Sequence, residues 1–227
     1  MAKLIYITNT TLDGYIEDAA GAFDWTDPQP IFGFITDLIR PIGTYLYGRR
    51  VYEPMALWDG PMEGYPPHFH DFAAVWQHAR KIVFSRTLPA AATRNTRIER
   101  HFDVEAVRAL KRESTHDLTI GGAELARVAL DAGLVDESHL FVHPIVVGGG
   151  KPAFRPPLRN ASRPDRHPVL QLGRDPRALS RAGTSLTASP RVPIEDAALL
   201  PGSRSGSLSE PAFSSIASQA RASRQSR

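Results

Sequence analysis

Cysteine does not occur among the 227 residues of the chain. Its absence excludes a disulfide framework, a thiolate zinc site and a cysteine nucleophile. The amino-terminal segment MAKLIYITNTTLDG also lacks an apolar run long enough for a signal peptide or a membrane span. We therefore expect a cytoplasmic protein without membrane contacts. No metal site is predicted, because His68, His70 and His78 fit a solvated helix better than a ligand set.

Lysine is missing from residues 155–227, where 12 arginines stand against 5 acidic residues. Residues 1–154 contain 15 Lys and Arg against 19 Asp and Glu, so the net charge of +3 comes from the second segment alone. Ser, Arg, Pro and Ala dominate that segment, and Phe213 is its single aromatic residue. We predict a domain over 1–154 and a disordered tail over 155–227, whose composition resembles a gene read in a shifted frame.

The body of the chain alternates apolar strands with amphipathic helices. We expect strands at Lys3–Asn9, Thr44–Tyr47, Ile82–Phe84, Asp117–Ile120 and His139–Val147, and helices at Ile31–Ile39, His68–His78, Val104–Leu110 and Ala123–Ala132. This alternation predicts an α/β fold with a mostly parallel central sheet and helices on both faces. In such sheets, ligands bind at the carboxyl ends of the strands.

Two adjacent glycines, Gly121 and Gly122, separate an expected strand from the helix that begins with Ala123 and Glu124. Unpaired N–H groups and the positive end of the helix dipole favour an anion at such a helix start, and a pyrophosphate can lie against a backbone without side chains. A tight strand-to-helix turn explains the glycines equally well. Both interpretations stay open from this motif alone.

Two further strand ends have a similar composition. Gly48, Arg49 and Arg50 follow the strand TYLY, and SRT at residues 85–87 follows the strand KIVF. Planar guanidinium groups suit phosphate oxygens. Each arginine alone is better explained as a solvated surface charge, but three strand ends with the same chemistry favour a nucleotide phosphate site.

Five segments then carry a resemblance to a known family: TLDGYIED, YLYGRRVYEPM, IVFSRTL, TIGGAELARVALDAGLVDE and HPIVVGGGKPAF. In this order and spacing they resemble the dihydrofolate-reductase-like family, and within it the reductase domains of bacterial riboflavin-pathway deaminase/reductase proteins. The similarity runs from about Lys3 to Phe154. It implies a stand-alone reductase without a deaminase domain, with an activity like that of 5-amino-6-(5-phosphoribosylamino)uracil reductase.

The resemblance also implies the cofactor, NADPH, and the residues that bind it. These lie after the strands and in the glycine motifs: Gly48, Arg49, Arg50, Ser85, Arg86, Thr87, Gly121, Gly122, Ala123, Glu124, Gly148 and Gly149. Hydride would pass from C4 of the nicotinamide to a C=N or C=O carbon of a small heterocyclic or ribosylamino substrate. The triple glycine that starts at Gly148 would close over the nicotinamide side.

On the substrate side the resemblance implies Asp13, Trp25 and Phe32. Asp13 would be catalytic, because it could hold a substrate hydroxyl or steer the proton that follows the hydride. An Asp-Gly turn is the alternative explanation of Asp13. Phe32 stands about where folate reductases carry a carboxylate that faces the pterin, so dihydrofolate is not expected as the substrate.

Two other functions remain open. The chain could bind NADPH without catalysis, or its basic tail could bind RNA, although the near absence of aromatic residues there argues against RNA and we expect no nucleic-acid partner. The family ends in an antiparallel pair of strands, and no sequence after Phe154 has that pattern, so we expect this hairpin to be missing. Relatives of this fold often form dimers, which makes a homodimer the expected assembly.

Overall fold

The computed structural model describes residues 1–25 and 32–154 of the chain. A six-stranded sheet in the order β5-β4-β3-β6-β1-β7 forms its centre, and every pair of neighbouring strands in it is parallel. The strands are β1 (Leu4–Thr11), β3 (Ile42–Gly48), β4 (Arg80–Phe84), β5 (Thr96–Glu99), β6 (Asp117–Gly121) and β7 (Glu137–His143). Two short strands, β2 (Tyr15–Asp18) and β8 (Gly150–Pro152), pair antiparallel beside it.

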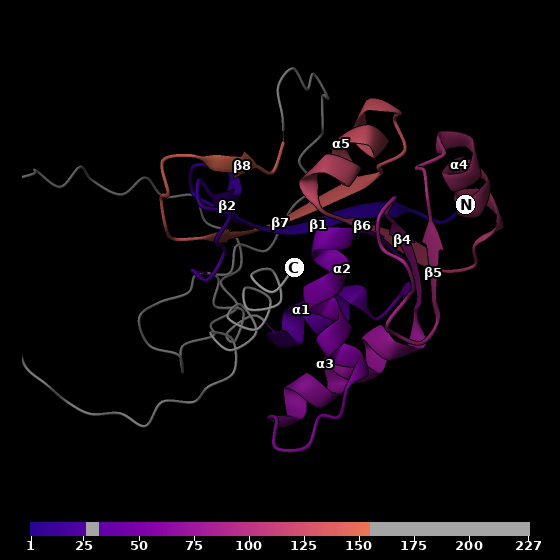
Figure 1. Cartoon of the computed structure of the whole chain (residues 1–227), viewed down its shortest axis with the longest axis horizontal. Coiled ribbons are helices and arrows are strands. Elements are labelled where there is room, and N and C mark those ends of the chain that lie inside the picture. Colours follow the sequence, from indigo (N-terminus) through magenta and orange to yellow (C-terminus); the bar gives the residue numbers. More distant parts are fainter. Residues whose placement is uncertain (26–31, 155–227) are drawn as a thin grey trace, which may run out of the picture. The chain divides into compact units, whose positions relative to one another are not determined.

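Helices cover both faces of the sheet (Figure 1). One face is covered by α4 (Val104–Glu113) and α5 (Ala123–Asp131), and the other by α1 (Phe32–Ile39), α2 (Arg49–Met55) and α3 (Pro67–His78). A short 3-10 helix, η2 (Ala56–Asp59), follows α2. The predicted α/β fold with a parallel sheet between two layers of helices is therefore confirmed.

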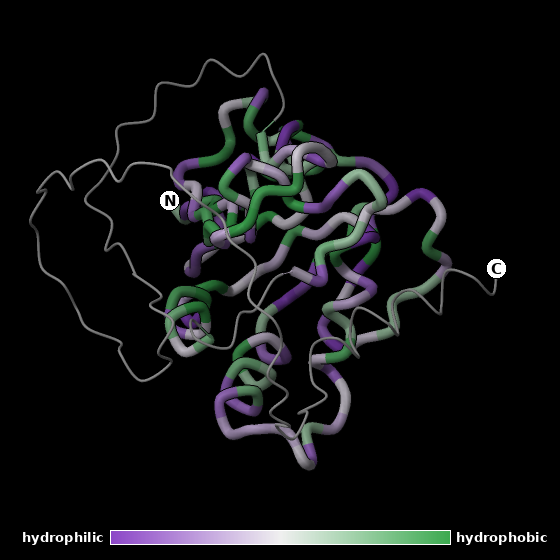
Figure 2. Tube along the Cα trace, turned by 90° about the vertical axis from the view of Figure 1, so that its left-hand side faces the viewer, coloured by the Kyte–Doolittle hydropathy of each residue, from purple (hydrophilic) through white to green (hydrophobic). Residues whose placement is uncertain are grey.

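Side chains that alternate along each strand build two separate cores. On the α4/α5 face, Leu4, Tyr6, Leu46 and Leu118 are fully buried with Ala126 of α5. The interior strands and the inner sides of the helices accordingly carry the apolar residues (Figure 2).

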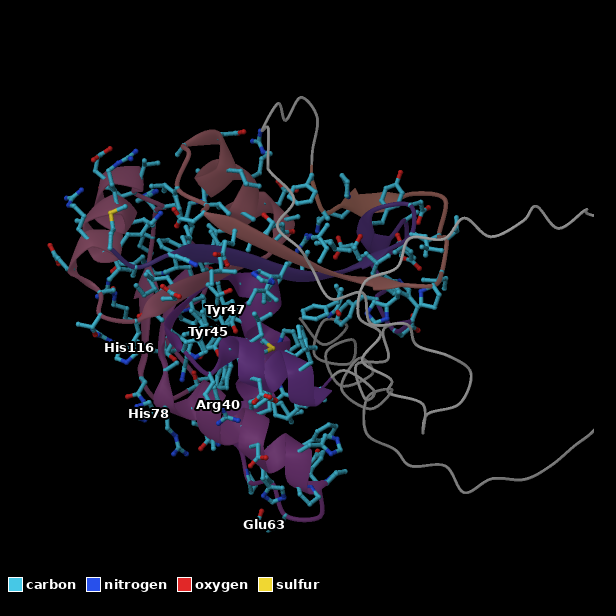
Figure 3. All side chains as sticks on the ribbon, turned by 180° about the vertical axis from the view of Figure 1, so that it is seen from behind. Arg40, Tyr45, Tyr47, Glu63, His78 and His116 are labelled. Atoms are coloured by element: carbon cyan, nitrogen blue, oxygen red, sulfur yellow. The ribbon has the colours of Figure 1, made fainter. Side chains whose placement is uncertain are left out.

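The second core, on the α1/α3 face, is aromatic. Tyr45 and Tyr47 of β3 stack with ring centroids 5.5 Å apart, and Figure 3 shows them side by side on the strand. Trp76 of α3 is fully buried and donates its indole N–H to the Tyr47 hydroxyl over 3.3 Å. Burial raises the pKa of Tyr45 and Tyr47 well above the usual value, so both phenols are neutral in the core.

Most predicted elements are present, with boundaries that shift by a few residues. The strand predicted at His139–Val147 is wrong over its last four residues, because β7 ends at His143. Pro144 has no N–H to donate to a ladder, and the chain turns there with the Ile145 N–H donating to the His143 carbonyl over 2.8 Å. The structure adds β2, α2, β5 and β8, which the sequence analysis did not predict.

Several predictions fall outside the described residues. The helix start expected at Ile31 is one, although α1 itself is present from Phe32. The tail over 155–227 and the missing hairpin are the others, and both stay predictions.

Candidate nucleotide-binding site

The predicted phosphate motifs gather at one edge of the sheet. Parallel pairing aligns the strand ends, since Gly48 is the partner of Phe84 and Tyr47 is the partner of Gly121. On the far side of β6, β1 and β7 end together at the pair Thr11 and His143. The carboxyl ends of five strands therefore line one edge, where parallel sheets bind their ligands.

Arg49 connects two of these strand ends. It is the first residue of α2, and its Nη1 donates to the Thr87 hydroxyl over 3.0 Å. Its Nε donates to the Glu53 carboxylate one turn later in α2 over 2.6 Å. The guanidinium is thus held between β3 and β4, half-exposed and partly neutralised by Glu53. Arg50 is the second residue of α2, Arg86 follows the end of β4 by two residues, and both are exposed.

Ser85 shapes the loop after β4. Its hydroxyl accepts the N–H groups of Thr87 and Leu88 over 3.3 and 3.0 Å, which folds the chain into a tight turn. Arg100, the residue after β5, stabilises this turn, because its Nη1 donates to the carbonyls of Ser85 and Leu88 over 3.0 and 2.8 Å. The sequence analysis missed Arg100, whose only signal was a position just after a four-residue strand.

Packing explains the glycine pair. A Cβ on Gly121 would lie 3.0 Å from Cδ1 of Tyr47 and 3.3 Å from Cγ1 of Val51, so the core leaves no space for one. Gly122 has a φ of +96°, a conformation that residues with side chains rarely adopt. The turn interpretation therefore suffices for both glycines, and pyrophosphate binding at this motif stays a prediction.

The start of α5 nevertheless has the features of an anion site. Gly122 is its N-cap and supplies no capping side chain, and the backbone N–H groups at the start of a helix point toward an acceptor. The Glu124 carboxylate lies in the first turn and is exposed. A carboxylate repels a phosphate, so Glu124 can contribute to phosphate binding only through its backbone.

Asp13 occupies a turn that also contacts the glycine-rich segment. The Gly14 N–H donates to the Thr11 carbonyl over 3.0 Å, which makes the predicted Asp-Gly turn. The exposed Asp13 carboxylate accepts the N–H groups of Gly148 over 2.8 Å and Val147 over 3.4 Å. A hydrogen bond from the Thr11 hydroxyl, followed by the one from Gly148, lowers the pKa of Asp13 below its usual value.

Trp25 lies next to a polar pair that the sequence analysis missed. His143 is buried and its Nε2 lies 3.0 Å from Oδ1 of Asn9. The Trp25 ring meets the His143 ring edge to face, with centroids 5.7 Å apart. The Trp25 indole N–H is buried and finds no acceptor among the described residues, which leaves a donor that a ligand carbonyl would satisfy.

Phe32 lies in the aromatic core instead of on an open surface. Its side chain is 3% exposed, and its ring packs against Phe69 and Phe72 of α3 at centroid distances of 4.7 and 5.0 Å. Phe32 is the first residue of α1, and its ring points into the core between α1 and α3. The predicted contact between Phe32 and the substrate is not tested by this geometry and stays a prediction.

Residues 1–25 and 32–154 contain neither a candidate metal cluster nor a candidate membrane-spanning helix. No group of three or more His, Asp or Glu side chains within these ranges could hold a metal ion. None of their helices combines the length and the apolar character needed to cross a bilayer.

Known proteins resemble the chain in both sequence and structure. The RibD C-terminal domain matches residues 2–172. The uncharacterized protein YyaP of Bacillus subtilis (strain 168) is 36% identical over 155 residues, which cover 67% of this chain and 80% of YyaP. A crystal structure of a protein from Shewanella sp. PV-4 named for riboflavin biosynthesis is 25% identical with a TM-score of 0.51, and covers 68% of this chain and 84% of its own. A dihydrofolate reductase from Enterococcus faecalis is 17% identical with a TM-score of 0.44, over 66% of this chain and 76% of its own.

The family match spans every strand of the central sheet and all of the motifs that carried the resemblance. It continues for 18 residues beyond Phe154, to residue 172. The reductase domain family that the sequence motifs implied is confirmed. The chain belongs to the family of the RibD C-terminal domain.

Proposed function

We propose that this chain is an NADPH-dependent reductase that transfers hydride to a C=N or C=O carbon of a small ribosylamino heterocycle. The observation that carries the proposal is the shared edge where β3, β4 and β6 end. There Arg49 and Thr87 are joined by a hydrogen bond, and the uncapped start of α5 lies at the end of the next strand. In a family of reductases, this edge supports a dinucleotide site.

The residues present fit the phosphates of NADPH. The adenosine 2′-phosphate requires cations, and Arg49, Arg50 and Arg86 follow the ends of β3 and β4 in the sequence. The pyrophosphate requires backbone N–H donors, and the start of α5, whose N-cap Gly122 has no side chain, is where we expect it to bind. NADH lacks the 2′-phosphate, so we expect the chain to prefer NADPH.

When bound, the nicotinamide supplies the hydride, and the protein supplies binding and orientation. Arg49 and its neighbours fix the adenosine end. At the other end, Asp13 holds the backbone of the glycine-rich segment that includes Gly148 and Gly149. The Trp25 indole N–H offers a donor to a carbonyl of the heterocycle.

The substrate that we propose is 5-amino-6-(5-phosphoribosylamino)uracil or a close relative. The family is named for a riboflavin-pathway protein, and the Shewanella relative is named for the same pathway. Uracil carbonyls are acceptors, and the Trp25 indole N–H is a donor without an acceptor among residues 1–25 and 32–154. A cytoplasmic location and a homodimeric assembly stay predictions from the sequence.

The test is a titration with NADPH and NADH followed by a turnover assay. Substrate-dependent loss of NADPH absorbance with the aminouracil would support the reductase. Tight NADPH binding without turnover on the aminouracil or on a panel of imines and carbonyls would favour the silent nucleotide-binding alternative. No binding of either nucleotide would contradict the proposal.

A further inference from the structure

The segment between β7 and β8 is fastened at both ends to the segment between β1 and β2. At its start, the Leu12 N–H donates to the Ile145 carbonyl over 2.9 Å. At its end, β8 pairs with β2, and the Ala153 N–H donates to the Gly14 carbonyl over 2.8 Å. Lys151 and Glu17 add an ion pair across the two strands. The glycine loop, residues 147–150, is therefore a short arc between two fixed points.

Asp13 is the side chain that holds the middle of this arc. Its Oδ2 accepts the Gly148 N–H over 2.8 Å, and its Oδ1 accepts the Val147 N–H over 3.4 Å. Gly148 has a φ of +71°, and a Cβ there would meet no atom within 4 Å. The glycine is thus required by the backbone conformation and not by lack of space, and that conformation aims its N–H at the carboxylate.

The hydrogen bonds at Asp13 also favour the charged form of its carboxylate. The Thr11 hydroxyl accepts the Tyr15 N–H over 2.9 Å, which leaves its own proton to donate to the Asp13 carboxylate. This hydrogen bond from Thr11 to Asp13 is the main cause of the lowered pKa of Asp13. A carboxyl with a lowered pKa is ionised at neutral pH. Asp13 therefore faces the loop as a charged acceptor.

We propose that Asp13 is a positioning residue, whose carboxylate fixes the glycine loop in the conformation that receives the nicotinamide end of the cofactor. This inference rests on the proposed function for the identity of the cofactor. The contact itself belongs to the protein alone. A charged acceptor holds two adjacent N–H groups more strongly than a neutral one, which explains a carboxylate at an exposed turn.

Three variants separate this role from a direct contact with substrate. Asp13→Ala removes both acceptors. Asp13→Asn removes the charge and keeps one carbonyl oxygen, which can still accept the Gly148 N–H. Asp117→Ala is the matched control, because Asp117 also accepts one backbone N–H over 2.8 Å, from Lys3, at the opposite edge of the sheet. Amide exchange of Val147 and Gly148 is measured by NMR without cofactor, and NADPH is then titrated into each protein.

We expect Asp13→Ala to speed Gly148 exchange by about tenfold to a hundredfold, the range for loss of a hydrogen bond to a charged group. Its NADPH dissociation constant should rise, and Asp13→Asn should restore both values part of the way. Asp117→Ala should match the wild type in both measurements.

Two results would overturn the inference. One is Gly148 exchange that is the same in Asp13→Ala and the wild type. The other is an Asp13→Asn protein with wild-type Gly148 exchange and NADPH affinity that loses aminouracil turnover as fully as Asp13→Ala, because it would make Asp13 a substrate contact. A wild-type protein that binds no NADPH would contradict the proposed function, whereas the exchange measurement still decides the loop contact.

Discussion

Replacing Arg49 by alanine should weaken NADPH binding far more than NADH binding. The guanidinium is held by Thr87 at 3.0 Å and Glu53 at 2.6 Å, at the strand ends where we propose the 2′-phosphate binds. A lost charge-assisted contact costs about 1.5–3 kcal/mol. That range corresponds to roughly one to two decades in the NADPH dissociation constant.

Replacing Glu53 should have the opposite effect on NADPH affinity. Its carboxylate competes with the phosphate for Arg49, and both side chains are about two-fifths exposed, at 37% and 41%. Exposed pairs of this kind contribute at most about 1 kcal/mol. Glu53→Gln should therefore tighten NADPH binding by up to about fivefold and leave NADH binding unchanged.

Fluorescence titrations of both nucleotides at one fixed ionic strength measure these effects, because salt screens exposed charges. Arg40→Ala is the control. Arg40 (Figure 3) is an exposed arginine paired with Asp37 at 3.2 Å. It precedes β3, whereas Arg49 follows that strand. The reasoning is refuted if Arg49→Ala weakens NADPH and NADH equally, or if it weakens neither.

Three further predictions concern stability and the tail. Gly121→Ala should cost roughly 1–3 kcal/mol of unfolding free energy, because the added Cβ overpacks against Tyr47. Gly48→Ala is the control and should be near neutral, because Gly48 has an ordinary φ of −77° and no atom within 4 Å of an added Cβ. Denaturant titrations measure both costs, and equal costs would contradict the packing argument. Desolvation lowers the pKa of the buried Lys81 from 10.5 to about 8, so the unfolded chain binds this proton more tightly than the folded chain does. The free energy of unfolding should therefore rise by at most about 3 kcal/mol as the pH goes from about 8 to about 10, and Lys81→Met should lose this rise. The same dependence of the unfolding free energy on pH in both proteins would contradict the prediction. Residues 155–227 should exchange their amides at coil rates, and a chain that ends at Phe154 should keep its NADPH affinity; slow exchange there, or a loss of affinity that a chain ending at Leu172 recovers, would refute the predicted domain boundary.

The sequence predicted the central sheet because its strands and helices carry strong periodic patterns. Leu4–Thr11 and Asp117–Gly121 alternate or run apolar between clear turns, and α5 has an apolar stripe. It failed for α2, which has seven residues and a proline at Pro54, and for β5, a four-residue strand with the sequence TRIE. Neither segment is long enough to show a hydrophobic periodicity, so each depends on its contacts with the rest of the fold.

The site was predicted at the level of motifs but not of contacts. The strand-end motifs at Gly48, Ser85 and Gly121 do meet at one edge, because parallel pairing brings strand ends together. The sequence does not show why residue 121 is a glycine, because the ring that leaves little room for a Cβ belongs to Tyr47, 74 positions earlier in the chain. The Asn9 and His143 pair was missed for the same reason, because only the β1–β7 register, which pairs Thr11 with His143, brings the two residues to neighbouring positions.

The most direct test of the account is the rate of NADPH oxidation by the full-length chain with 5-amino-6-(5-phosphoribosylamino)uracil. We predict loss of NADPH absorbance that depends on both the protein and the aminouracil, that is slower with NADH, and that Arg49→Ala slows at subsaturating NADPH. A chain that binds NADPH but oxidises none of it with this substrate or with any imine or carbonyl tested would contradict the claim that the protein is a reductase.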